Sequence, residues 1–218
     1  MKLEQAELDR LLRAADLVEI QMLMAKYDSY LDRDDFNSIY TLMAQGHPEL
    51  EYEIVEGGAY VGEHVTQLIA AQMKKHGISK NKRGWVGLQY LWTPRIILSK
   101  DGTRAHAQWN QLSPHGMPVT PYPGNEHRPT PYWFIGKYDN EFIKIDGEWK
   151  ILKVHVCAQA RPPYEEGWLR QPDCRRMYHP GSGKPDRRPR LYVYHPDAVY
   201  AGDSSDSYEP YMPEEGSF

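Results

Sequence analysis

The hydrophobic period of this chain changes near Trp85, and this change constrains the fold more than any single motif. Upstream, apolar residues recur at steps of three and four, which places them on one face of a helix. The clearest set is Leu17, Ile20, Met24, Tyr27 and Leu31. Downstream the pattern alternates, and Asp-Gly pairs at 101–102 and 146–147 mark tight turns. This order predicts an α+β fold, with three N-terminal helices packed on one face of a strongly curved, mainly antiparallel sheet.

The same periods predict where the elements lie. Helices are expected at residues 4–32, 36–44 and 62–75, and Asp34 or Asp35 can cap the second helix. Strands are expected at 50–54, 85–98, 103–112, 132–145 and 149–158. Residues 114–131 are rich in proline, and this segment is long enough to form a lid or a subunit contact.

Composition excludes several classes of protein. The 218 residues are 40% hydrophobic and 26% charged, which is typical of a soluble domain with an appendage. The net charge of −4 argues against nucleic-acid binding, and no stretch approaches the roughly 20 apolar residues of a membrane span. Cys157 and Cys174 are too few for a disulfide framework, and the N-terminal segment does not resemble a signal peptide. We therefore expect a cytoplasmic protein with no nucleic-acid or membrane partner.

The last part of the chain has a different composition. Residues 1–160 carry the helix and strand periods, whereas residues 161–218 are rich in proline, tyrosine and charge with almost no period. Disordered tails are usually poor in aromatic residues, so an arm that packs on its own barrel or on a neighbour's is the better interpretation. The arm and the proline-rich segment together suggest a homo-oligomer, either a dimer or a trimer.

Several short motifs resemble the SnoaL-like branch of the nuclear transport factor 2 (NTF2)-like superfamily over residues 10–160. They are, in order, IQMLMAKY at 20–27, LDRDDF at 31–36, TPRI at 93–96, GKY at 136–138 and DGEWKI at 146–151. The resemblance implies a cone-shaped α+β barrel with an apolar pocket at its open end. Enzymes of this family include dehydratases, polyketide cyclases, ketosteroid isomerase and lyases that release formaldehyde from lignin-derived aryl diols. They work without a metal or an organic cofactor, whereas other members only bind.

The resemblance implies catalytic roles for Tyr27 and Asp32 on the first helix. Asp28 is the reserve candidate because it lies closer in angle to the apolar face of that helix. In the related dehydratases a histidine precedes the strand proline by five residues, but this chain has Gln89 at that position before Pro94. Glutamine can orient a substrate but cannot carry a proton, so another residue would have to do so.

Two histidines are candidates for that proton transfer. His106 shares one strand face with Gln108 and Asn110, although such a polar row also fits a face turned to solvent. His155 lies near the end of the last barrel strand, where relatives often direct an arginine or histidine into the cavity. A buried core histidine is the alternative there. The other histidines lack the spacing of a metal site, so we expect no metal.

Aromatic residues are frequent in the expected sheet and suit a planar substrate. The expected substrate-binding residues are Gln89, Trp92, Asn110, Trp133 and Tyr138. Together these features predict a cofactor-independent lyase that releases water or formaldehyde from a bulky phenolic compound. The alternatives are a small-molecule-binding or assembly domain, or an isomerase or cyclase of the same fold.

Overall fold

A computed structural model describes residues 4–54, 58–76, 86–117, 130–165, 185–187, 191–192 and 207–208. Its helices are α1 (Gln5–Leu31), α2 (Phe36–Thr41) and α3 (Glu63–His76). The start of α1 is fixed by Glu4, whose backbone N–H donates to the Glu7 carboxylate at 3.1 Å. The start of α2 is capped by Asp35, which accepts the Ser38 N–H at 3.1 Å. None of the described helices is long and apolar enough to cross a membrane.

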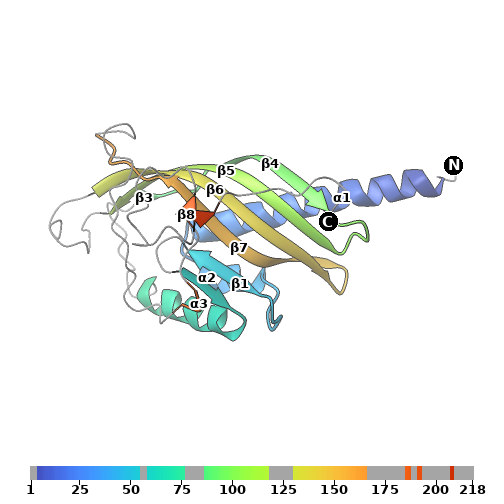
Figure 1. The fold of residues 1–218 in the computed structure, drawn as a ribbon, viewed down its shortest axis with the longest axis horizontal. Coiled ribbons are helices and arrows are strands. Elements are labelled where there is room, and N and C mark those ends of the chain that lie inside the picture. Colours follow the sequence, from blue (N-terminus) through green and yellow to red (C-terminus); the bar gives the residue numbers. More distant parts are fainter. Residues whose placement is uncertain are drawn as a thin grey trace.

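The strands form one large sheet and a small second one. The large sheet contains β1 (Glu51–Ile54), β2 (Gly58–Val61), β3 (Val86–Gly87), β4 (Leu91–Leu98), β5 (Arg104–Met117), β6 (Thr130–Ile145) and β7 (Glu148–Ala160). Its order is β2-β1-β7-β6-β5-β3, with β4 also paired to β5. Within this large sheet only the β1–β7 pair is parallel, and the sheet curls around α1 (Figure 1). The small sheet pairs β8 (Leu191–Tyr192) with β9 (Ser207–Tyr208). The predicted α+β fold, with helices on a curved, mainly antiparallel sheet, is confirmed.

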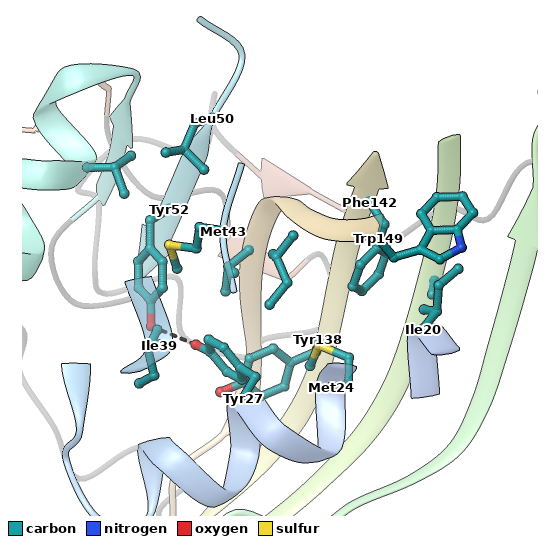
Figure 2. Close-up of a cluster of buried hydrophobic side chains, with 14 of the residues drawn as sticks. Ile20, Met24, Tyr27, Ile39, Met43, Leu50, Tyr52, Tyr138, Phe142 and Trp149 are labelled. Carbon is teal, nitrogen blue, oxygen red and sulfur yellow. Dashed lines mark hydrogen bonds between the residues drawn. The ribbon is translucent and has the colours of Figure 1, made fainter. Parts of the chain in front are cut away.

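The core lies between α1 and the inner face of this sheet. Ile20, Met24 and Tyr27 of α1 are completely or almost completely buried, as their helical spacing predicts. They point toward strand residues such as Tyr138 and Phe142 (Figure 2). Each fully buried large apolar side chain contributes about 1.5–3 kcal/mol to folding, so this contact fixes α1 against the sheet.

Some predicted elements differ from the observed ones. The strand expected at 85–98 is divided into β3 and β4, and a register shift between Trp92 and Arg95 surrounds Thr93, which has a positive φ of 49°. Strand β2 was not predicted. The loop expected at 114–131 is shorter, because β5 continues through Pro114 to Met117 and β6 begins at Thr130. The central part of the expected lid, residues 118–129, lies outside the described residues.

One segment of the C-terminal region, Pro185–Arg187, lies against the edge strand β2. The Ala59 N–H donates to the Arg187 carbonyl at 2.9 Å, and the Val61 N–H donates to Asp186 at 2.8 Å. A Cβ atom on Gly58 would lie 2.4 Å from the Arg187 carbonyl oxygen, so the close approach requires glycine. We call Pro185–Arg187 the docked segment. Most other residues after 165 lie outside the described part of the chain.

Candidate active site

The inner face of β5 changes from apolar to polar beyond Trp109. The register between β5 and β6 is unbroken, so alternate residues of β5 keep to one face throughout. Ala105, Ala107 and Trp109 are buried in the core, which defines this face as the inner one. The next residues on the inner face are Gln111, Ser113 and His115. A row of hydrogen-bonding side chains therefore continues directly from the core.

Gln89 completes a cluster of hydrogen bonds with this row. Ser113 Oγ donates to Gln89 Oε1 at 3.2 Å and accepts from Gln111 Nε2 at 2.9 Å. Gln111 Nε2 also contacts Gln89 Oε1. These bonds use the amide nitrogen of Gln111, while its buried Oε1 has no hydrogen-bond partner among the described residues. A buried acceptor without a partner is costly, so this atom is suited to a ligand that brings a donor.

Asp32 connects α1 to the same cluster. It caps the C-terminal end of α1, and its Oδ1 accepts the backbone N–H of Gln89 at 2.9 Å. Burial raises the pKa of Asp32, while this hydrogen bond and the nearby Arg33 oppose the increase. Asp32 thus holds the segment between β3 and β4 in place, and one of its oxygens is already occupied.

Asp28, one turn earlier on α1, has a different environment. It is half-buried, and its buried Oδ1 has no hydrogen-bond partner among the described residues. Burial, reinforced by the negative charge of Asp32, raises the pKa of Asp28 from 3.8 to about 7. A carboxyl group with this pKa takes up and releases protons readily near neutral pH. We call Asp28, Asp32, Gln89, Gln111 and Ser113 the inner polar cluster.

Three buried tyrosines lie together in the core, and one of them, Tyr138, interacts with both carboxylates. The hydroxyl groups of Tyr27 and Tyr52 are 2.7 Å apart (Figure 2), and the rings of Tyr27 and Tyr138 meet edge to face with centroids 6.0 Å apart. Burial, with contributions from Tyr52 and Tyr138, raises the pKa of Tyr27 well above 10.0. Burial also raises the pKa of Tyr138, and Asp28 and Asp32 add to that increase. The hydroxyls of Tyr27 and Tyr138 therefore stay protonated and can act as hydrogen-bond donors at all physiological pH values.

His115 is a further member of the inner face that the sequence prediction missed. Its ring stacks on Tyr132 with centroids 5.0 Å apart and an interplanar angle of 7°. The proline-rich composition from Pro114 onward predicts a loop at His115, but β5 continues to Met117. The alternation of Trp109, Gln111, Ser113 and His115 was the available signal.

Four of the predicted site residues lie together in this region. Tyr27 and Tyr138 are buried beside the carboxylates, and Gln89 and Asp32 belong to the inner polar cluster. Asp28, the reserve candidate, joins them. The prediction of their roles rested on the resemblance, whereas their proximity follows from the packing of α1 on β5 and β6.

His106 and Asn110 lie on the outer face of β5, because they alternate with the buried Ala105, Ala107 and Trp109. His106 Nε2 lies 2.7 Å from Asp139 Oδ1, which also accepts from Gln108 Nε2 at 3.0 Å. The exposed Asn110 donates to Thr93 Oγ1. The structure therefore separates both residues from the inner polar cluster by the thickness of the sheet.

His155 also lies on the outer face. It pairs with Glu53 in the β1–β7 register, and the neighbouring pair, Tyr52 and Val154, faces the core. His155 is 1% exposed, and its Nε2 is 3.3 Å from Glu53 Oε1. Arg187 of the docked segment contacts the other Glu53 oxygen at 2.8 Å. The position of His155 matches the alternative expected from the sequence, which is a buried core histidine with a partner.

The two predicted tryptophans lie away from the cluster. Trp92 is 44% exposed, next to the irregularity in β4. Trp133 alternates with the buried Tyr132 and Phe134 and therefore lies on the outer face, where its ring is 6.2 Å from that of Tyr164. Among the described residues, no group of histidine, cysteine, aspartate and glutamate has the arrangement of a metal site.

The model of the SnoaL-like domain matches residues 12–155. No curated protein sequence matches the chain.

Among solved structures, the Kfla4162 protein from Kribbella flavida has a TM-score of 0.54 and 16% identity, over 69% of this chain and 95% of the other. A type 2 hexachlorocyclohexane dehydrochlorinase (LinA) has a TM-score of 0.51 and 18% identity, over 72% and 92%. A protein from Novosphingobium aromaticivorans, provisionally designated a scytalone dehydratase, has a TM-score of 0.50 and 15% identity, over 80% and 95%. At these identities the likeness concerns the fold.

Proposed function

This chain belongs to the SnoaL-like domain family, and we propose that it is a cofactor-independent lyase that uses Asp28 as the base in an acid–base elimination. One observation carries the proposal: Asp28 has a buried carboxylate oxygen without a hydrogen-bond partner in the described part of the chain, and its pKa is raised to about 7. Two structural relatives support it, since their names denote removal of hydrogen chloride and of water. The substrate we propose is a bulky phenolic compound that carries an aliphatic hydroxyl group.

Asp28 suits the role of base better than Asp32. A general base is most effective when its pKa lies near the operating pH and it can reach the substrate proton directly. Asp32 already accepts the Gln89 N–H, and that bond opposes the rise of its pKa. The negative charge of Asp32 also helps to raise the pKa of Asp28. We therefore assign Asp32 a positioning role.

The tyrosines would stabilise negative charge that develops during the reaction. Tyr27 and Tyr138 are buried, and their raised pKa values keep the hydroxyls protonated. A protonated hydroxyl can donate a hydrogen bond to an oxygen on which charge develops, and burial strengthens that bond. Tyr52 holds the hydroxyl of Tyr27 in position through their 2.7 Å contact.

In the proposed dehydration, Asp28 removes a proton from carbon, and the neighbouring carbon–oxygen bond breaks with its electron pair. The leaving oxygen takes up a proton and departs as water. For release of formaldehyde from an aryl diol, the benzylic hydroxyl first takes up a proton and leaves as water while the phenol loses its proton, which gives a quinone methide. Asp28 then removes the proton of the primary alcohol, and the carbon–carbon bond breaks to release formaldehyde. The electron pair of that bond forms the new carbon–carbon double bond and restores the aromatic phenolate. His115, on the inner face and stacked on Tyr132, is our candidate to supply the second proton. His106 and His155 lie on the other face, so we do not assign them this step.

The inner face favours an aromatic substrate with hydroxyl groups. The Oε1 of Gln111, which has no partner among the residues that the structure describes, would accept a hydrogen bond from a substrate hydroxyl. His115, which stacks on the buried Tyr132 and lies beside the buried Phe134, is only partly buried and provides a planar surface at the polar end of the row. The substrate ring would stack there, while its reacting side chain extends toward Asp28.

The decisive experiment compares the turnover of the Asp28→Asn and Asp32→Asn variants on a panel of aryl diols and aryl alcohols. Asp28→Asn keeps the shape but removes the proton acceptor, so turnover should fall by roughly 100-fold or more with little change in substrate affinity. Wild-type turnover should rise with pH through about 7 as Asp28 ionises. Asn110→Ala, on the outer face, is the matched control and should retain full activity. Full turnover by Asp28→Asn would refute the assignment of the base.

An isomerase is the second candidate function. A carboxylate beside hydrogen-bonded tyrosines also suits the movement of a proton from one carbon of a substrate to another, without a leaving group. Mass spectrometry of the product separates the two reactions, because a lyase product is lighter than its substrate and an isomerase product is not. Binding of aromatic compounds without any conversion would instead favour a binding domain.

A further inference from the structure

Helix α1 has a second apolar stripe on the side that faces away from the sheet. Five large apolar residues of α1 are between 41% and 58% exposed: Leu8, Leu11, Leu12, Val18 and Met22. Val18 is two residues from the buried Ile20, which corresponds to about 160° around the helix. The same helix therefore presents one apolar face to the core and another to solvent.

The stripe is long and regular. Four of these residues and Ala15 follow one another at alternating steps of three and four residues: Leu8, Leu11, Ala15, Val18 and Met22. This spacing is the heptad pattern by which one helix packs along another. The first turns of α1 also project beyond the end of the sheet (Figure 1), so they are free of the barrel. A single exposed leucine is ordinary, but a continuous helical stripe of this kind needs a partner surface.

We propose that this stripe binds the same stripe of a second copy of the chain in an antiparallel helix pair with its two-fold axis at Ala15. Such an axis makes four residues of the stripe complementary to one another, whereas Leu11 lies opposite the partner copy's Glu19. Leu8 meets the partner copy's Met22, and Leu12 meets its Val18, because the members of each pair are equally far from Ala15. At the axis two alanines meet, and their small side chains allow the helices to approach closely.

The charges at the ends of the stripe favour the antiparallel arrangement. Glu4 and Lys26 are both exposed and lie eleven residues before and after Ala15. An antiparallel pair therefore places Glu4 of each copy opposite Lys26 of the other copy. A parallel pair would place like charges opposite each other at both positions and also at Glu19, which is unfavourable.

Sedimentation tests the dimer. A contact limited to one helix pair lies at the small end of specific interfaces, so the mass is measured from about 5 to about 200 µM protein. Wild type should reach about twice the 25.3 kDa of one chain. Val18→Glu buries a carboxylate in the contact and should weaken association about 100-fold or more. Gln21→Glu introduces the same charge at an exposed position beside the stripe and should leave association nearly unchanged.

Both variants should fold normally, because Val18 and Gln21 are exposed in the single chain. An unchanged melting temperature of the monomeric Val18→Glu protein verifies this. A wild-type protein that stays monomeric over the whole range would overturn the proposal. So would an assembly whose mass Val18→Glu does not lower.

Cysteine cross-linking tests the direction of the helices. Leu8→Cys and Met22→Cys are prepared separately and then mixed under mild oxidation. An antiparallel pair joins the two variants in a mixed disulfide-linked dimer, while Leu8→Cys alone does not cross-link above the wild-type level. A parallel pair would do the reverse and would overturn the proposed axis at Ala15. These tests do not depend on the proposed lyase activity, since no residue of the inner polar cluster changes.

Discussion

Replacement of Asp28 by asparagine should stabilise the protein at high pH and have little effect at low pH. Burial raises the pKa of Asp28 from 3.8 to about 7, so the folded protein holds this proton more tightly than the unfolded chain does. Below about pH 4 the group is protonated in both states and the effect vanishes. Between about pH 4 and 7 the unfolded chain ionises first, and the folded state loses stability as the pH rises.

The size of the effect follows from the same pKa values. A rise from 3.8 to about 7 corresponds to about 4 kcal/mol for a fully shielded group. Asp28 is only half-buried, and solvent screening reduces this to about 1–2 kcal/mol. Asparagine fills nearly the same volume without ionising. Above about pH 7 Asp28→Asn should therefore be more stable than wild type by about 1–2 kcal/mol.

Urea unfolding at a series of pH values from about 4 to about 9 measures this difference. Asp9→Asn, an exposed position on the same helix, is the matched control, and it should not reproduce the gain in stability that Asp28→Asn shows above pH 7. The reasoning is wrong if the difference between Asp28→Asn and wild type is the same at both ends of the series, or if wild type is the more stable protein above pH 7.

Three further predictions concern other parts of the structure. Tyr52→Phe removes a hydrogen-bond partner of the buried Tyr27 and should lower the free energy of unfolding by about 1 kcal/mol in urea titration, whereas no change would show that the contact is unimportant. Gln111→Leu should weaken binding of hydroxylated aromatics about 10-fold by calorimetry, with no change for the same ring without a hydroxyl group. Gly58→Ala should loosen the docked segment and speed its proteolysis. Gly147→Ala is the control, because Gly147 also has a positive φ but no close neighbour, and it should leave this proteolysis unchanged. Equal effects of the two variants would mean that backbone strain, and not the close contact at Gly58, causes the change.

The sequence by itself determined the elements and the fold class. The three-to-four period of α1 and the two-residue alternation of the strands show which residues share a face that can be buried. These patterns depend only on residues that are close together in the sequence. Asp35 as a helix cap and the Asp-Gly turn after Ile145 are equally local, because their hydrogen bonds or backbone angles involve near neighbours. The prediction that the strand ends before Pro114 is wrong, because Pro114 has no N–H yet still fits inside β5, three residues before its end at Met117.

Only the tertiary structure decided which polar residues meet. Alternation shows that His106 and Gln111 lie on opposite faces of β5, but the sequence does not state which face α1 covers. That is fixed by long-range packing of Met24 and Tyr27 against the face that carries Trp109. The pKa of Asp28 is likewise a property of the packed molecule, because burial and the charge of Asp32 raise it together, and neither acts fully until the helix lies on the sheet.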